Sequence, residues 1–389
     1  MKDLSNKIKL MQPSGIREFF NYASENPDII SFGVGEPDFV TPMPIINAGK
    51  KSLEEGKTFY TSNQGLPILR EKISKYLRSK FDVDYSKEEI MLTAGSSQGI
   101  LAALMAIINP GDEIIVTEPT YICYVPDIEM CGGKAVVVPL RAENDFKLTK
   151  KDLKEYITPR TKALFLSFPN NPTGAIMLKE DLEAIIPLII KNDLYVISDE
   201  IYAELTYGCK HSSIASFKGL KERTILISGF SKAFAMTGWR LGYVCAPKHI
   251  FEQILKIQQY ILLSAPTIAQ YGAIAALDQC SSYVKSMVKE YNRRREYLLM
   301  SFKEMGIDCF DARGAFYLFP SIKSFGMSSR ELCLRLLKEC NILVVPGTAF
   351  GNSGEGFIRI SYASSFTKLK KFIETLKKFR ENYLKNSNK

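Results

Sequence analysis

A lysine and an arginine lie eight residues apart in a stretch rich in small residues, Ser228-Gly-Phe-Ser-Lys232-Ala-Phe-Ala-Met-Thr-Gly-Trp-Arg240-Leu-Gly242. When burial partly desolvates a lysine, its pKa falls, and the neutral amine can attack an aldehyde to form a Schiff base. The guanidinium of Arg240 and the hydroxyl of Ser231 are suited to binding a phosphate. Taken alone, however, Lys232 could also be a solvated loop lysine and Arg240 a surface ion-pair partner.

Other polar residues come directly after strand-like runs of apolar residues. In an open α/β sheet, ligands bind beyond the carboxyl ends of the strands, so residues that do chemistry should cluster there. In this chain Gly95–Ser97 follows Ile90–Thr93, Asn170–Gly174 follows Thr161–Phe168, Asp199–Tyr202 follows Leu194–Ser198, and Lys232 follows Thr224–Ser228.

The middle of the chain alternates between strand and helix signals. Helix-like segments such as Ser97–Ile108 and Lys179–Lys191 separate or precede short apolar runs, most of which are rich in Val and Ile. This alternation predicts an α/β fold whose mainly parallel sheet is buried on both faces. The predicted strands are Glu113–Thr117, Ala135–Leu140, Thr161–Phe168, Leu194–Ser198, Thr224–Ser228 and Leu241–Ala246.

The pattern changes after about Lys248. A charge-laced helical stretch from about Ser282 to Met305 leads into a smaller α+β unit. At 389 residues the chain is longer than a single core usually grows, so we expect two domains. We assign residues 46–283 to a large domain, and residues 1–45 and 284–389 to a small one. The strands of the small domain are predicted near Ala315–Phe319, Ile342–Val345 and Gly356–Ser361.

Composition and charge exclude several classes of protein. The net charge of +9 comes from 51 basic and 42 acidic residues, and no nucleic-acid-binding motif accompanies the basic tail from Lys368 to Lys389. No apolar run reaches the ~18 residues of a membrane span, and residues 1–10 lack the apolar core of a signal peptide. We therefore expect a cytoplasmic protein that binds neither membrane nor nucleic acid.

Cysteine and histidine usage argues against two kinds of chemistry. None of the eight cysteines forms a C-x-x-C pair, and the two histidines, His211 and His249, lie near no cysteine pair. We expect reduced cysteines and no metal site. Neither histidine sits in a motif of a Ser-His-Asp or Cys-His enzyme, so the base of a reaction should be another residue.

The fifteen-residue stretch around Lys232 closely resembles the lysine signature of class I pyridoxal-phosphate-dependent aminotransferases, which have fold type I. Six further stretches match motifs of this family, in order and at suitable spacings, so the resemblance covers nearly the whole chain. In overall look the chain is most similar to the aromatic-amino-acid and aspartate aminotransferases of archaea and bacteria. The six stretches are Gly33-Val-Gly-Glu-Pro-Asp-Phe39, Phe59-Tyr60, Thr93-Ala-Gly-Ser-Ser-Gln98, Asn170-Asn-Pro-Thr-Gly174, Ser198-Asp-Glu-Ile-Tyr202 and Ile358-Arg-Ile-Ser-Tyr362.

The resemblance implies that Lys232 is the catalytic residue and carries pyridoxal phosphate as a Schiff base. Asp199 would pair with the protonated pyridine nitrogen, which makes the ring a stronger electron sink. Asn171 and Tyr202 would hydrogen-bond the ring hydroxyl oxygen, and Tyr121 would stack on the ring. Taken singly, these four residues have simpler interpretations as strand-end, turn or packing residues.

The resemblance also implies how the phosphate is held. Gly95, Ser96 and Ser97 would present amides and a hydroxyl at a helix N-terminus, where the helix dipole favours an anion. Ser231 and Arg240 would complete this site. A plain serine N-cap is the simpler alternative for the serines. Tyr60 would reach the phosphate of a neighbouring subunit, which implies a homodimer with shared active sites. Otherwise Tyr60 is a surface tyrosine.

Substrate binding is implied at the opposite end of the site. Arg359 matches the arginine that binds the α-carboxylate of the substrate, for which a guanidinium fork is well shaped. Gly35 and Asn171 would assist, and relatives indicate that the segment around Ser14–Phe20 closes over the substrate. The simpler interpretation of Arg359 is a surface ion pair.

The chain departs from the family pattern at three positions. Gly229 stands where some relatives carry a phosphate-binding serine, and Tyr121 stands where many have tryptophan. Ser97 stands where some close relatives have a lysine, which argues against strict aspartate specificity.

The implied reaction is transamination with ping-pong kinetics, in which Lys232 also acts as the general base at Cα. We expect an aromatic or broad-range L-amino acid as donor and a 2-oxo acid such as 2-oxoglutarate as acceptor. Three alternatives remain open. The first is a carbon–sulfur lyase or another fold type I enzyme, such as a cyclopropane-forming synthase. The second is an aspartate- or alanine-type aminotransferase, and the third is a non-catalytic regulator.

Overall fold

The seven-stranded sheet at the centre of the molecule has the strand order β2-β8-β7-β6-β5-β3-β4. This computed structural model describes residues 3–5, 8–9, 11, 26 and 28–387, so the segment around Ser14–Phe20 lies outside the described residues. All pairs from β7 to β4 are parallel, whereas β8 runs antiparallel to both of its neighbours. The strands are β2 (Ile90–Thr93), β3 (Glu113–Glu118), β4 (Lys134–Pro139), β5 (Thr161–Ser167), β6 (Tyr195–Asp199), β7 (Thr224–Gly229) and β8 (Gly242–Cys245).

Helices cover both faces of this sheet, because successive strand residues point to opposite sides. On β5, Leu164 packs in one core with residues of α7 and α8, whereas Phe165 packs in another with residues of α5, α6 and α9. The helices of this part are α3 (Met43–Glu54), α4 (Pro67–Phe81), α5 (Ser96–Ile107), α6 (Tyr124–Met130), α7 (Lys150–Tyr156), α8 (Lys179–Lys191), α9 (Lys248–Ile261) and α10 (Thr267–Gln279).

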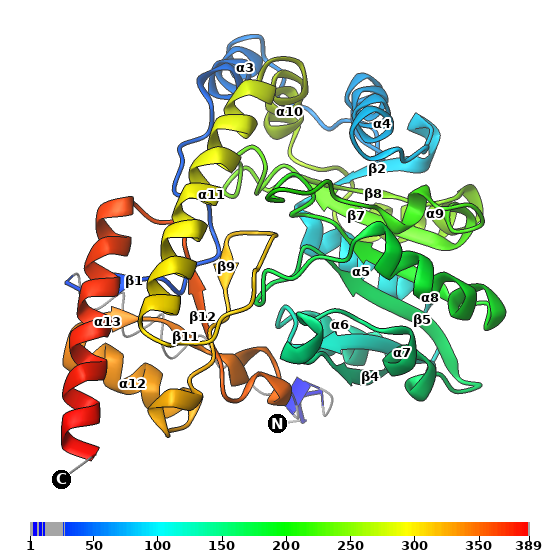
Figure 1. Cartoon of the computed structure of the whole chain (residues 1–389). Helices are drawn as coiled ribbons and strands as arrows, with labels where there is room; N and C mark the ends of the chain where they lie inside the picture. Colours follow the sequence, from blue (N-terminus) through cyan, green and yellow to red (C-terminus); the bar gives the residue numbers. More distant parts are fainter. Residues whose placement is uncertain (1–2, 6–7, 10, 12–25, 27, 388–389) are drawn as a thin grey trace.

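A smaller α+β unit lies beside the large sheet, and the long helix α11 (Ser281–Glu304) runs alongside both (Figure 1). A third core fills this unit, with Phe316, Leu336 and Phe372 among its fully buried side chains. Strand β1 (Ile30–Ser31) pairs parallel with β10 (Ile342–Leu343), and β12 (Ile358–Ser361) pairs antiparallel with β9 (Tyr317–Leu318) and β11 (Val345–Pro346). Its helices are α12 (Ser329–Cys340) and α13 (Phe366–Ser387).

The predicted fold class is confirmed. Each predicted strand of the large sheet matches an observed strand to within a few residues, and the predicted helix from Ser282 to Met305 is α11. The predicted boundary at residues 283 and 284 falls inside α11, and this division into domains stays a prediction. No helix in the described part of the chain is long and apolar enough to cross a membrane.

Gly242 lets the sheet approach the loop that precedes α5. Gly242 of β8 pairs with Gly229 of β7 at the end of the sheet. A Cβ on Gly242 would lie 2.6 Å from both the carbonyl carbon of Gly95 and the backbone nitrogen of Ser96. Real Cβ atoms do not approach backbone so closely, so glycine at this position fixes where the α5 N-terminus sits.

We predict that Gly242→Ala destabilises the protein by about 1–3 kcal/mol, because the new methyl group must displace backbone on a neighbouring segment. Thermal unfolding followed by circular dichroism measures the effect. Gly238→Ala is the matched control, since a Cβ there meets nothing within 4 Å. Equal unfolding midpoints for the two variants would contradict this account of Gly242.

Candidate active site

A cleft of about 580 Å³ opens at the carboxyl ends of the parallel strands. Among the predicted site residues, all except Tyr60 and Gly95 line it. They are joined by residues that the sequence analysis did not single out for this site: Gly33, Val34, Glu36, Ile100, Ile122, Tyr124, Ile201, Thr237 and Tyr317.

Lys232 lies in the middle of the cleft, in the turn that follows β7. Its Nζ donates a hydrogen bond to the carbonyl oxygen of Gly35 at 2.6 Å. Burial lowers the pKa of this amine to about 8, although the nearby carboxylate of Glu36 acts in the opposite direction. The structure thus excludes the solvated loop lysine, and the lowered pKa increases the neutral fraction of the amine relative to an exposed lysine.

Asp199 ends β6 and faces the same cleft. Its Oδ2 accepts a hydrogen bond from the hydroxyl of Tyr124 at 2.8 Å, and its Oδ1 accepts one from the backbone N–H of Ile201 at 3.1 Å. Burial raises the pKa of Asp199 to about 6, while the bond from Tyr124 works in the opposite direction. The carboxylate is therefore held in one orientation, facing the interior of the cleft.

The N-terminus of α5 and Arg240 form one end of the cleft. Arg240 has a left-handed φ of 53°, and its Nη2 donates to the carbonyl oxygen of Ala94 at 3.4 Å. A Cβ on Gly95 would lie 2.5 Å from this Nη2, so the guanidinium rests on the glycine. Gly95 precedes the helix with a φ of 82°, and Ser96 and Ser97 line the cleft. This end combines a cation with free helix N–H groups, which suits a phosphate.

Gly229 has no room for a serine side chain. A Cβ at this position would lie 2.9 Å from both the Cα of Gly242 and the carbonyl oxygen of Leu241. The phosphate-binding serine of some relatives is thus replaced here by a close contact between two strands.

Arg359, on β12, forms the other end of the cleft and is buried. Its Nη1 donates to the Oδ1 of Asn171 at 2.9 Å, and its Nη2 donates to the carbonyl oxygen of Gly33. The guanidinium lies over the rings of Tyr317, at 4.7 Å, and Phe350, at 4.6 Å. Its Nε is buried without a hydrogen-bond partner. Arg359 is thus no surface ion-pair residue.

Two tyrosines of this site were missed by sequence reasoning. The hydroxyl of Tyr317 lies 2.8 Å from that of Tyr202, and a Cβ on Gly35 would lie 2.3 Å from it. Tyr124 holds Asp199. Only their places in the sequence could have indicated these two residues. Tyr124 lies three residues after the predicted site residue Tyr121, and Tyr317 lies in a predicted strand.

Tyr60 stands apart from the cleft, with 81% of its surface exposed. The segment that carries it packs beside the N-terminus of α10, where Thr267 donates to the carbonyl oxygen of Phe59 at 2.7 Å. Within one subunit, therefore, Tyr60 is not brought to the other site residues.

This arrangement matches the chemical features of pyridoxal phosphate. The α5 N-terminus with Arg240 suits its phosphate, and the amine of Lys232 suits its aldehyde. Asp199 suits the ring nitrogen, since a carboxylate can pair with a pyridinium. No cluster of metal-ligating side chains occurs among the residues that the structure describes.

Comparison with known proteins gives the family. The family model for aminotransferase class I and II matches residues 27–376. The chain is 44% identical over 379 residues to an aspartate aminotransferase of Pyrococcus abyssi, with coverage of 96% of this chain and 97% of the relative. It is 42% identical over 379 residues to aromatic-amino-acid aminotransferase 2 of Thermococcus litoralis, with the same coverage of 96% and 97%.

A solved structure agrees with the sequence relatives. The crystal structure of the aromatic aminotransferase from Pyrococcus horikoshii aligns with a TM-score of 0.89 at 42% sequence identity, and it covers 94% of this chain and 99% of that one. The family uses pyridoxal phosphate. The predicted family is thus confirmed: the chain belongs to the class I and II aminotransferases, and the protein is an aminotransferase.

Proposed function

We propose that this aminotransferase binds pyridoxal phosphate through Lys232 and moves an amino group from an aromatic or broad-range L-amino acid to a 2-oxo acid such as 2-oxoglutarate. The observation that carries the proposal is the placing of a desolvated amine, Lys232, between an anion site and a buried carboxylate-binding arginine in one cleft. When bound, pyridoxal phosphate supplies an electron sink that stabilises negative charge at the Cα of the amino acid.

Side chains at both ends of the cleft would orient the two ligands. Arg240, Ser96, Ser97 and Ser231 would hold the phosphate, with Gly95 starting the helix that points at it. Asp199, kept in place by Tyr124, would hold the proton on the ring nitrogen. Asn171 and Tyr202 would bind the ring hydroxyl oxygen, and Tyr121 would cover one face of the ring.

Proton transfer at Cα would fall to Lys232. A general base works best when its pKa lies near the working pH, and burial brings the pKa of this amine to about 8. Arg359 would bind the α-carboxylate and so fix where the Cα proton lies. Gly35 and Asn171 would stand beside that carboxylate, and the hydrogen bonds of Arg359 to Asn171 and Gly33 pre-orient its guanidinium.

The walls of the cleft favour an apolar substrate side chain. Val34, Ile122 and Tyr121 line it, and its cationic side chains among the described residues are Lys232, Arg240 and Arg359. All three have assigned partners in this scheme, so no fourth cation of the described chain meets a side-chain carboxylate. Aspartate specificity remains the second candidate, since the Pyrococcus abyssi relative is named an aspartate aminotransferase.

An exposed aromatic surface supports a homodimer. Phe59, Tyr60 and Tyr260 are 81%, 81% and 91% exposed. The two segments that carry them are joined, because Asn63 donates to the carbonyl oxygen of Leu263 at 2.9 Å. Exposed aromatic patches of this kind mark protein interfaces. A second copy of the chain would cover this surface and receive Tyr60 at its phosphate site. We place the enzyme in the cytoplasm.

We predict that the cofactor-free protein captures pyridoxal phosphate faster as the pH rises, with a midpoint near the Lys232 pKa of about 8. The neutral amine is the nucleophile and the protonated amine below that pH is not, so capture slows on the acid side. Absorbance of the bound cofactor after mixing gives the rate. Lys232→Ala should form no borohydride-reducible adduct, whereas Lys256→Ala, at an exposed position of α9, should behave as the parent protein. Capture by Lys232→Ala with the same pH dependence would overturn the assignment.

We predict that tyrosine and phenylalanine convert the bound cofactor to its pyridoxamine form with kcat/KM at least about tenfold above aspartate and alanine. The apolar walls of the cleft favour aromatic side chains, and the described residues that line the cleft include no cation beyond Lys232, Arg240 and Arg359 for a second carboxylate. Single-turnover absorbance without an acceptor ranks the donors. A ranking headed by aspartate would favour the second candidate.

We predict that mixing Tyr60→Ala subunits with Lys232→Ala subunits restores activity that neither variant has at limiting cofactor. In a shared-site dimer, the mixed pair contains one site with both Lys232 and the partner's Tyr60 intact. Activity of the mixture is measured after the subunits are dissociated and reassembled. No gain over the separate variants would contradict a site shared between subunits.

A further inference from the structure

A buried carboxylate lies directly behind Asp199 and has no part in the scheme above. Glu200 follows Asp199 in the chain, and its carboxylate is 3% exposed. Its Oε1 accepts hydrogen bonds from Ser198 at 2.8 Å and from Ser213 at 2.7 Å. Its Oε2 lies 2.8 Å from the Nε2 of His211, whose side chain is 5% exposed. A buried carboxylate is costly unless it is paired, and here its pairing is complete.

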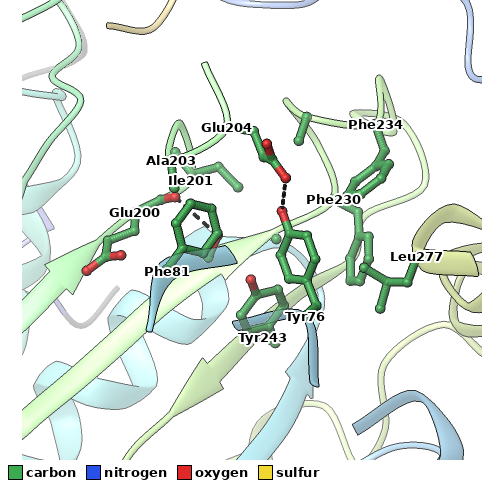
Figure 2. A pocket seen from close by; sticks show the side chains of 13 residues that line it. Tyr76, Phe81, Glu200, Ile201, Ala203, Glu204, Phe230, Phe234, Tyr243 and Leu277 are labelled. Carbon is green, nitrogen blue, oxygen red and sulfur yellow. Dashed lines mark hydrogen bonds between the residues drawn. The ribbon is translucent and has the colours of Figure 1, made fainter. Parts of the chain in front are cut away.

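Asp199 and Glu200 point to opposite sides of the sheet end. Asp199 lines the active-site cleft, and Glu200 lines a separate cavity of about 10 Å³ on the far side of the segment that carries Lys232. Figure 2 shows the Glu200 carboxylate directed away from the neighbouring Tyr76–Glu204 pair, which is joined by a hydrogen bond of 2.7 Å. His211 is thus the ionisable partner that Glu200 contacts among the described residues.

Other titratable groups near Glu200 stay uncharged or are paired elsewhere. Burial raises the pKa of Tyr85, Tyr243 and Cys245, so these three side chains are neutral near pH 7. Glu204 takes a hydrogen bond from Tyr76 and an ion pair with Lys80 at 3.3 Å. The edge of the His211 ring packs against Phe81, with ring centroids 5.5 Å apart. Among the described residues, His211 is therefore the ionisable side chain in direct contact with the Glu200 carboxylate, while Glu204 is paired with Lys80.

The two faces of β6 are electrostatically coupled. The titratable groups that face Asp199 itself are Tyr121, Cys123, Tyr124 and Lys232. Burial raises the pKa of the two tyrosines and the cysteine above their usual values, so these three side chains are neutral near pH 7. The negative charge of Glu200 acts to raise the pKa of Asp199, and the charge of Lys232 acts to lower it. An uncompensated Glu200 would thus favour the protonated form of Asp199.

We infer that His211 is a positioning residue that acts through Glu200: its contact with this buried carboxylate offsets the negative charge, and Asp199 can then stay ionised on the other face of the strand. The inference rests on the proposed role of Asp199 at the cofactor ring nitrogen. A histidine that served only as a hydrogen-bond donor to Glu200 would fill the same space but would leave the charge of Asp199 unchanged.

Three substitutions separate charge from hydrogen bonding. His211→Gln keeps a donor near Glu200 and removes the positive charge, whereas Glu200→Gln removes the negative one. The double variant carries neither charge. His249→Gln is the matched control, because His249 is exposed on α9. Titration of the Asp199 carboxyl by infrared difference spectroscopy in cofactor-free protein is the main readout, with Asp199→Asn identifying the band.

We predict that His211→Gln raises the titration midpoint of Asp199 by about one pH unit from its value near 6. Glu200→Gln and the double variant should bring the midpoint to the parent value or below it, and His249→Gln should leave it unchanged. In cofactor-loaded protein, the acid limb of the kcat/KM profile should move in the same directions. A structural role alone would lower the unfolding temperature of all three variants without this pattern of signs.

An unchanged Asp199 midpoint in His211→Gln would overturn the inference, and so would a rise in Glu200→Gln. If His211→Gln fails to fold while the double variant folds, the uncompensated charge is the cause, which supports the ion pair. Failure of both to fold would contradict it. Because the titration uses cofactor-free protein, its outcome does not depend on whether the proposed donors react.

Discussion

Desolvation of charged groups in one cleft is the constraint on which the rest of the site depends. Lys232, Asp199 and Arg359 come from distant parts of the sequence, and burial is the largest cause of the pKa shift in each. Such groups must be held by neighbours, because solvent does not stabilise them. Parallel strands in register supply the frame, since Asp199 is aligned with Ser167 of β5 and with Ile227 of β7. These residues therefore need a fixed set of hydrogen bonds for two reasons, to offset the cost of burying their charges and to keep their side chains in position.

The loop between β1 and α3 contacts residues at both ends of the cleft. Between β1 and α3, the carbonyl oxygen of Gly33 accepts from Arg359 and that of Gly35 accepts from Lys232. Further on, both carboxylate oxygens of Asp38 accept a hydrogen bond from Nη1 of the buried Arg294 on α11, at 2.8 and 2.9 Å. Lys232 and Arg359 are thus positioned by the same short loop, which is also held by Arg294 of α11. A shift of this loop would therefore move Lys232 and Arg359 together, and Gly35 leaves no room for a side chain beside Tyr317.

Sequence patterns predicted the large sheet well because its strands are continuous apolar runs, and they located Lys232, Asp199 and Arg359 because family motifs carry them. They could not supply partners across the fold. The bond from Tyr124 to Asp199, and the contact between the hydroxyls of Tyr202 and Tyr317, join segments 75 and 115 residues apart. The missing serine at Gly229 was visible in the sequence, but its cause, the close approach of Gly242, appears only when two strands are paired. The proposed role of Tyr60 requires a second subunit, because within one subunit its side chain is exposed and stands apart from the cleft.

The end of β6 shows why the two faces of a buried strand cannot be adjusted independently. Residue alternation sends Asp199 to the cleft and Glu200 to the opposite face, so the carboxylate that we propose for the cofactor ring nitrogen has a second carboxylate as its immediate neighbour. In a low-dielectric interior the charge on one face is felt on the other. In our proposal, the contacts of Glu200 with two serines and His211 serve both faces: they satisfy a buried carboxylate behind the site, and they set the field that acts on Asp199. A substitution on the far face can accordingly change the pH dependence of a reaction that it never contacts.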